Sequence, residues 1–452
     1  MEEPNATTPS ANLVNASLAW DDKKRTGLSF KVYQDLKSSV HRDLLSKVDV
    51  EKIATVRDER TRAQVLAVIQ DLVANLKTPM SGRERERLAI EVADEVFGLG
   101  PLEPLLQDPT INDILVNGHK QVYVERAGML EETNIVFKDD AHLMHIIDKI
   151  VSAVGRRVDE SSPMVDARLL DGSRINVIIP PLSVDGPNLS IRRFGQIPVA
   201  ENDLLENKTL TPAMLTLIKG AVSARLNIVV SGGTGAGKTT MLNVLSGYIS
   251  DKERIVTIED SAELQLKQRH VVRLECRPAN VEGKGAVMQR QLVANSLRMR
   301  PNRIIIGEVR GEEALDMLQA MNTGHDGSIT TIHANSPRDA IARMETMALM
   351  SNLNINEIAV RRQIASAVTI VIQVSRFSDG TRRVTHLTEI TGMEQDTVSM
   401  QDVFVFEKHG VAPDGRVLGA FTATGIRPKF ADKLKASGIA VPANFFEQSV
   451  KV

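Results

Sequence analysis

The amino-acid sequence predicts an α/β fold whose larger part is a mostly parallel sheet with helices on both faces. Three observations predict it. From residue 210 onward, short β-branched runs alternate with helical patterns. A glycine-rich turn joins the first of these strands to a helix, as at the carboxyl edge of many such sheets. A smaller segment with strands and one helix precedes this region, and amphipathic helices precede that segment.

The chain has 452 residues, enough for two or three domains. Apolar residues at a spacing of four, such as Val32, Leu36 and Val40, predict helices before residue 98. Polar residues from 200 to 208 predict a linker. We therefore expect a disordered tail (1–28), a helical unit (29–98), a smaller α/β domain (99–199), the linker (200–208) and a larger α/β domain (209–452) that ends in a β-hairpin and helix.

The elements expected in the two α/β domains follow from the same patterns. In the smaller domain we expect strands at 113–117, 121–125, 164–170, 174–179 and 189–194, and a helix at 141–154. In the larger domain we expect strands at 226–230, 255–258, 271–274, 303–306, 329–332, 369–376, 382–390 and 401–407. The expected helices are 238–249, 286–299, 312–321, 337–350, 356–367 and 428–438.

Composition restricts the function. The net charge is −2 and aromatic residues are 3 %, which is poor material for binding nucleic acid, so we expect no nucleic-acid partner. One cysteine, Cys276, excludes an internal disulfide and a multi-cysteine zinc site. No apolar run approaches eighteen residues, and the first residues lack a signal-peptide pattern. We therefore expect a cytoplasmic protein.

The glycine-rich turn has the pattern of a phosphate-binding loop. From Gly232 to Thr239 it reads G-x-x-x-x-G-K-T between an apolar strand and a helix. Glycines let backbone N–H groups converge on phosphate oxygens, a lysine supplies positive charge, and the hydroxyl of Thr239 is a predicted Mg²⁺ ligand. A chance match is expected in roughly one chain in a hundred of this length. The predicted nucleotide-binding residues are Gly233, Thr234, Gly235, Ala236, Gly237, Lys238, Thr239 and Thr240.

Carboxylates follow two of the expected strands. The run 303–306 is followed by one glycine and then Glu308. A carboxylate at the end of such a strand is predicted to face Mg²⁺ or the attacking water. Three further carboxylates, at Glu259, Asp260 and Glu263, follow the strand 255–258. We assign Glu263 to polarising water and Glu259 to the nucleotide site, although such clusters are often solvated loops.

Two histidines flank one expected central strand. His325 precedes the strand 329–332 and His333 follows it, at the edge expected to carry the phosphate loop. A single histidine is usually structural, but this pair predicts sensors of a terminal phosphate. We assign His333 to catalysis and His325 to nucleotide binding.

Together these motifs resemble those of the secretion-superfamily traffic ATPases of bacterial pili and of type II and type IV secretion. The family's marks are present in family order: a Walker A loop (232–239), an acidic "Asp box" (257–264), a Walker B motif (303–311) and a "His box" (323–335). Asn302 stands where the family often has aspartate, so it receives no carboxylate role.

Within that superfamily the chain looks most like the tight-adherence (Flp-type) pilus assembly motor. The runs that carry this finer resemblance are 166–174, 178–194 and 423–428. The zinc-binding cysteine cluster of many type II secretion ATPases is absent, which favours the tight-adherence or type IV secretion branch.

The resemblance implies a RecA-like P-loop ATPase domain after a PAS-like α/β domain, assembled as a homohexamer. It implies ATP and Mg²⁺ as cofactors, with Thr239 and Glu308 near the metal. The nucleotide is expected between the two α/β domains, where arginines of the smaller one act in catalysis. The four arginines in question are Arg168, Arg174, Arg192 and Arg193. For Arg310 the expected role is instead to stabilise the interface between subunits of the ring.

The resemblance also implies a motor at the cytoplasmic face of the inner membrane. It would act on membrane platform proteins to drive pilin movement during pilus assembly, with retraction left open. The nearest alternative is a type IV secretion ATPase that drives effector export. Two rival classes are a nucleic-acid translocase, which the neutral charge disfavours, and a non-hydrolysing scaffold, which the acidic and histidine motifs disfavour.

Overall fold

The structure is a computed structural model that describes residues 30–47, 59–126, 128–169, 171–193, 199–277, 279, 284–351 and 355–451. The predicted tail, 1–28, lies outside the described residues. The chain divides into two compact units, Met1–Gln196 and Ile197–Val452. The predicted linker, 200–208, contains a short helix, α8 (Glu201–Glu206). None of the helices in the described part of the chain is long and apolar enough to cross a membrane.

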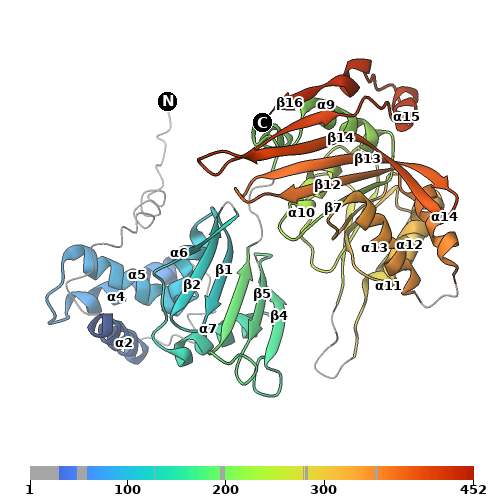
Figure 1. Cartoon of the computed structure of the whole chain (residues 1–452). Coiled ribbons are helices and arrows are strands. Elements are labelled where there is room, and N and C mark those ends of the chain that lie inside the picture. Colours follow the sequence, from blue (N-terminus) through green and yellow to red (C-terminus); the bar gives the residue numbers. More distant parts are fainter. Residues whose placement is uncertain are drawn as a thin grey trace, which may run out of the picture. The chain divides into compact units, whose positions relative to one another are not determined.

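The first unit begins with three helices that share one small core (Figure 1). They are α2 (Phe30–Lys47), α4 (Glu59–Ala74) and α5 (Gly82–Phe97). Val40, Ile69 and Leu88, one from each helix, are buried in that core. Ser81 and Glu84 form a capping box that satisfies backbone donors at the start of α5.

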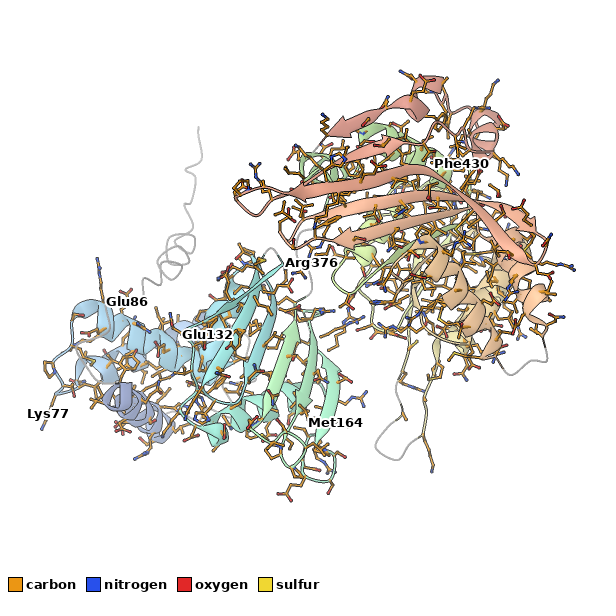
Figure 2. The ribbon with its side chains drawn as sticks, in the orientation of Figure 1. Lys77, Glu86, Glu132, Met164, Arg376 and Phe430 are labelled. Carbon is orange, nitrogen blue, oxygen red and sulfur yellow. The ribbon has the colours of Figure 1, made fainter. Side chains whose placement is uncertain are left out.

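The rest of the first unit is a six-stranded sheet in which neighbouring strands are antiparallel. The order is β3-β2-β1-β6-β5-β4, with β1 at Ile111–Asn117, β2 at Gln121–Arg126, β3 at Met129–Glu132, β4 at Met164–Arg168, β5 at Arg174–Ile178 and β6 at Asn188–Arg192. Short helices η1 (Gly100–Leu102) and α6 (Glu103–Gln107) precede it. Helix α7 (Asp140–Ala153) buries Ile146 against Ile114 and Ile191 of the sheet. Met164, labelled in Figure 2, is 60 % exposed on β4.

The second unit is built on a ten-stranded mixed sheet. In sheet order the strands are β16 (Ser449–Lys451), β15 (Val417–Ala423), β14 (Thr397–Val411), β13 (Arg382–Glu394), β12 (Ile370–Arg376), β7 (Ile228–Gly232), β11 (Ile329–Ile332), β10 (Arg303–Val309), β8 (Ile255–Glu259) and β9 (Val271–Glu275). Neighbours from β12 to β9 run parallel, and those from β16 to β12 run antiparallel.

Helices cover both faces of the parallel half, which explains why every residue of β7, β8 and β11 is buried, whereas the edge strand β9 is partly exposed. One core contains residues of α9 (Pro212–Ser223), α10 (Lys238–Ser246) and α15 (Phe430–Ala436). The other contains residues of α11 (Gln289–Ser296), α12 (Glu313–Asn322), α13 (Pro337–Leu349) and α14 (Glu357–Ala367), which Figure 1 shows gathered together. The 3₁₀ turns η2 (Leu297–Met299) and η3 (Ala443–Glu447) complete the unit.

Element boundaries differ from the predicted ones at several places. Strand β7 runs to Gly232 because its pairing with β12 continues to that residue. The helix expected at 286–299 is shorter, since α11 begins at Gln289 and changes to a 3₁₀ turn at Leu297. Strand β14 extends beyond both predicted ends, and β3, β15 and β16 were not expected.

Candidate functional site

The predicted phosphate loop joins β7 to α10 at the carboxyl edge of the parallel strands. Gly235 and Gly237 have φ values of 68° and 96°, a region that favours glycine. A Cβ atom at Gly232 would collide with the carbonyl oxygen of Val374 on β12. Backbone conformation and close packing therefore both require glycine in this loop.

Lys238 crosses the loop and reaches the next strand. Its side chain is buried, with Nζ donating to the Gly233 carbonyl at 3.1 Å. The same Nζ lies 3.0 Å from Nε2 of His333, which follows β11. Burial lowers the pKa of Lys238, while the Glu308 carboxylate opposes that shift. The structure thus brings two predicted site residues, from loops 95 positions apart, into direct contact.

Glu308 completes this cluster from β10. Its Oε1 lies 2.7 Å from His333 Nε2, and its Oε2 accepts from Arg310 Nη2 at 2.6 Å. The register between β10 and β11 shifts at Ile306–Val309, a β-bulge that contains Glu308. Bulges re-aim side chains next to active sites. Thr331 lies within the run 323–335 but was assigned no role from the sequence; its hydroxyl donates to the Gly307 carbonyl at 2.7 Å.

The protonation of His333 follows from its surroundings. Burial and the neighbouring Lys238 cation lower its pKa below the ordinary value of 6.5. The imidazole is therefore neutral at pH 7, and Nε2 can accept from Lys238 or donate to Glu308, but not both. The cluster combines a cation, a neutral imidazole and a carboxylate beside a loop of backbone N–H groups.

The carboxylates at the end of β8 and just after it have different partners. Glu259 is buried, and its Oε1 accepts from the N–H groups of Glu263 and Leu264 at 2.7 and 2.9 Å. Burial raises its pKa. Asp260 pairs with Arg310 at 2.9 Å, so Arg310 joins this run to Glu308 within one chain. Glu259 therefore fixes the backbone of the loop that carries Glu263.

Cys276 lies beside the same acidic run. Its backbone N–H donates to the Glu259 carbonyl at 3.0 Å. Burial and the Asp260 carboxylate raise the pKa of the thiol to about 12.

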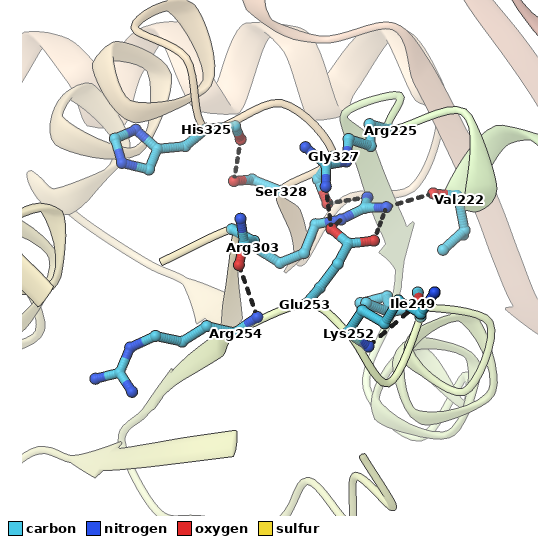
Figure 3. A network of polar contacts seen from close by, with 12 residues as sticks. Val222, Arg225, Ile249, Lys252, Glu253, Arg254, Arg303, His325, Gly327 and Ser328 are labelled. Atoms are coloured by element: carbon cyan, nitrogen blue, oxygen red, sulfur yellow. Dashed lines mark hydrogen bonds and ion pairs between the residues drawn. The ribbon is translucent and has the colours of Figure 1, made fainter. Parts of the chain in front are cut away.

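His325 does not join the Lys238 cluster. It precedes β11 and lies at the amino edge of the strands, whereas His333 follows β11 at the carboxyl edge. A strand of four residues separates these edges by roughly 13 Å. Figure 3 places His325 near Ser328, whose hydroxyl donates to the His325 carbonyl at 2.8 Å.

The amino edge holds a second arginine–glutamate cluster, which no sequence motif predicts (Figure 3). Arg303 opens β10 and has no exposed surface. Its Nε and Nη2 donate to the two carboxylate oxygens of Glu253 at 2.7 and 3.2 Å. Nη1 donates to the Gly327 carbonyl at 3.0 Å and Nη2 to that of Val222 at 2.8 Å. Arg225 also pairs with Glu253, at 3.1 Å.

Three of the four predicted arginines of the first unit form a row. Arg168, Arg174 and Arg192 are directly paired across β4, β5 and β6, so their side chains leave the same face of the sheet. Arg192 also pairs with Asp113 of β1 at 3.1 Å. Arg193 is separate, because its guanidinium donates to the backbone carbonyls of Asp108 and Ile111.

Comparison with known proteins gives three findings. Residues 95–412 match the family described as "Type II/IV secretion system protein". The chain is 39 % identical over 331 residues to a putative conjugal transfer protein of Mycobacterium tuberculosis, a match that covers 72 % of this chain and 93 % of that one. It is 31 % identical over 322 residues to the type IV secretion system protein VirB11 of Brucella suis, covering 65 % and 89 % respectively.

Among solved structures, the chain is similar to the VirB11 ATPase from the type IV secretion system of Brucella suis. That match has 30 % identity and a TM-score of 0.35, and it covers 64 % of this chain and 95 % of that one.

Proposed function

Because the chain belongs to the type II/IV secretion system protein family, we propose that it is an ATPase that drives a secretion-type machine. The observation that carries the proposal is the contact among Lys238, His333 and Glu308 beside the phosphate loop. Relatives named as a type IV secretion system protein VirB11 and as a putative conjugal transfer protein support it.

Each member of the cluster has a distinct task in this proposal. Lys238 neutralises charge on the outer phosphates of ATP. A phosphate oxygen carries negative charge, so it would replace the neutral imidazole of His333 as the partner of Nζ. Glu308 orients the attacking water and accepts its proton, a role that needs a carboxylate beside the reacting phosphate. His333, kept neutral, donates or accepts one hydrogen bond at the terminal phosphate and releases it after hydrolysis.

The residues present fit a magnesium nucleotide. Glycines with positive φ allow backbone N–H groups to converge on a phosphate, and α10 begins directly after them, so its N-terminal end would face that phosphate. The described residues contain no group of three or more His, Cys, Asp or Glu able to hold a metal ion. Mg²⁺ needs no such group, because it commonly binds through phosphate oxygens and one or two protein ligands. Thr239, with Glu308, would hold it, and the ion would neutralise charge on the phosphates.

The arginine row supports a second part of the proposal, that the first unit supplies catalytic cations. Like charges directly opposite each other destabilise a sheet. Three arginines in register across adjacent strands gather positive charge on one face of the sheet, and Asp113 offsets part of it at Arg192. We propose that Arg168, Arg174 and Arg192 act on the phosphates of ATP, and Arg193 is the weaker candidate because backbone carbonyls hold it.

The names of the relatives bear on which machine the motor drives. Conjugal transfer and type IV secretion support export of a macromolecule at least as well as pilus assembly. We therefore propose a type IV secretion ATPase that works as a homohexamer with inner-membrane proteins at the cytoplasmic face. The tight-adherence pilus motor stays the second candidate, on the runs 166–174 and 423–428. Co-purification with membrane proteins, followed by their identification, separates the two.

One experiment tests the proposed chemistry in three variants of the full chain. Lys238→Ala should abolish ATP turnover, and Glu308→Gln should lower it by about 10²–10⁴-fold while ATP still binds. Arg174→Ala should lower turnover with little change in folding. The measurements are phosphate release and equilibrium ATP binding, with Arg416→Ala, an exposed arginine, as the control. Wild-type turnover in Lys238→Ala would refute the assignment, and lost ATP binding in Glu308→Gln would make Glu308 structural.

A further inference from the structure

The hairpin formed by β12 and β13 lies on the far side of the phosphate loop from the catalytic cluster. In the sheet, β7 has β11 and β10 on one side and β12 and β13 on the other. His333 and Glu308 come from β11 and β10, on the first side. On the second side, Val374 of β12 pairs with Gly232, so the hairpin continues the sheet directly beside the loop.

Two arginines at the end of this hairpin touch the loop. Arg376 is the last residue of β12 and Arg382 is the first of β13. Arg382 Nε donates to the Gly235 carbonyl at 3.0 Å. A Cβ atom built on Gly235 would lie 3.1 Å from Arg376 Nη1, and one on Gly237 would lie 3.2 Å from Arg382 Cδ. Both arginines therefore pack against the two loop glycines with positive φ.

The turn between the two arginines is firmly held. Asp379 Oδ1 accepts from the N–H and the hydroxyl of Thr381, at 3.0 and 2.6 Å. Its Oδ2 accepts from the N–H of Val417 on β15 at 2.8 Å. Arg383, which follows Arg382 in β13, donates to the carbonyls of Asn207 and Lys208 at 2.9 and 2.5 Å. These bonds hold the turn and the start of β13, so the backbone that carries Arg376 and Arg382 has a defined position before ligand binds.

A nucleoside triphosphate is a linear chain, and this sets its direction along the loop. If its terminal phosphate meets His333 and Glu308, the loop holds the middle of the chain, and the nucleoside end leaves on the β12–β13 side. Resting on the proposed ATPase function, we infer that Arg376 and Arg382 bind the nucleoside end of ATP. Arginine suits this end because its planar guanidinium stacks on a purine and its forked donors reach the α-phosphate and ribose.

The experiment compares ligands that have a nucleoside with one that lacks it. ATP, ADP and inorganic tripolyphosphate are each titrated calorimetrically, with Mg²⁺, into the wild-type chain and into Arg382→Met and Arg376→Met. Arg416→Met is the matched control, since Arg416 is exposed and pairs with Asp414 in the loop before β15. We expect ATP and ADP to bind at least tenfold more weakly to both hairpin variants, and tripolyphosphate to bind within twofold of wild type.

The outcomes separate the alternatives. Equal weakening of ATP and tripolyphosphate would mean that the arginines only brace the loop, and unchanged binding of all ligands would mean no role; either result overturns the inference. Should Arg382→Met fail to fold by circular dichroism, Arg382→Lys, which keeps the charge without the fork, is expected to show a weaker form of the same selective loss. A folded wild-type chain that binds neither ATP nor tripolyphosphate would overturn the proposed ATPase function itself, which the variant comparison alone cannot do.

Discussion

An arginine–glutamate pair lies at each end of strand β10, and the two arginines differ in how far they are buried. At the amino end Arg303 pairs with Glu253, has no exposed surface, and uses all its donor nitrogens on fixed acceptors. At the carboxyl end Arg310 pairs with Glu308, but the arginine side chain is 55 % exposed. Glu308 Oε1 lies 2.7 Å from His333 Nε2 yet receives no well-aligned hydrogen bond among the described residues.

The difference indicates which cluster holds the fold and which is available to a substrate. A buried ion pair with every donor and acceptor satisfied cannot bind a new partner without breaking an existing bond. At the carboxyl end the arginine is exposed and one oxygen of Glu308 has no hydrogen-bond partner among the described residues, so that oxygen can accept a new partner without breaking an existing bond. The amino-edge cluster therefore anchors the ends of α9 and of strands β8, β10 and β11, and the carboxyl-edge cluster carries the chemistry.

The largest expected effect breaks the amino-edge cluster. Arg303→Met leaves the Glu253 carboxylate with only Arg225, and should lower the free energy of unfolding by about 3–5 kcal/mol. Turnover per folded molecule should change little, because the cluster lies at the other edge of the sheet. Denaturant unfolding and ATP turnover measure the two quantities.

A matched control uses the partner of Arg303. Adding Glu253→Gln to Arg303→Met removes the buried charge and should recover part of the lost stability. A single variant as stable as wild type would contradict the anchoring role. A stable variant without turnover would place Arg303 in the catalytic machinery.

A smaller effect is expected where the fold supports the catalytic edge. Thr331→Val keeps the shape of a fully buried side chain but leaves the Gly307 carbonyl in the bulge without its donor. We expect a loss of about 1–3 kcal/mol in the free energy of unfolding, and a fall in kcat because Glu308 is no longer held in position. Thr216→Val, on the exposed side of α9, is the control. Unchanged kcat in a destabilised Thr331→Val chain would limit Thr331 to a structural role.

The smallest effect concerns pH. The folded pKa of His333 lies below its unfolded value, so the stability it contributes is present above pH 6.5 and is lost as pH falls below 6.5 toward the folded pKa. One third of the side chain is exposed, so screening keeps this contribution to about 1 kcal/mol or less. Unfolding measured from pH 5 to 8 should therefore be less pH-dependent in His333→Gln. A steeper dependence in that variant would reverse the assigned direction of the shift.

The parallel half of the second unit was predictable because its strands are continuous β-branched runs bounded by turns; β11 has the predicted bounds, 329–332. Strand β15 was missed because its run contains glycine and alanine, and its pairing with β14 leaves no room for a Cβ at Gly419. That His333 lies at the same edge as the phosphate loop was predictable, because parallel strands end at one edge; its direct contact with Lys238 was not predicted. The pair of Arg303 and Glu253 could not be predicted, because the two residues are 50 positions apart, belong to no motif, and meet only in the folded sheet.

The protonated state of Cys276 has a practical consequence for measuring this molecule. Thiol reagents attack the thiolate, and a thiol whose pKa is about 12 contains very little of it at neutral pH. Since the chain has no second cysteine, a probe directed at an engineered, exposed cysteine should mark that site selectively. Probes for spectroscopic distance measurements can thus be attached to an engineered cysteine in each unit without first replacing Cys276.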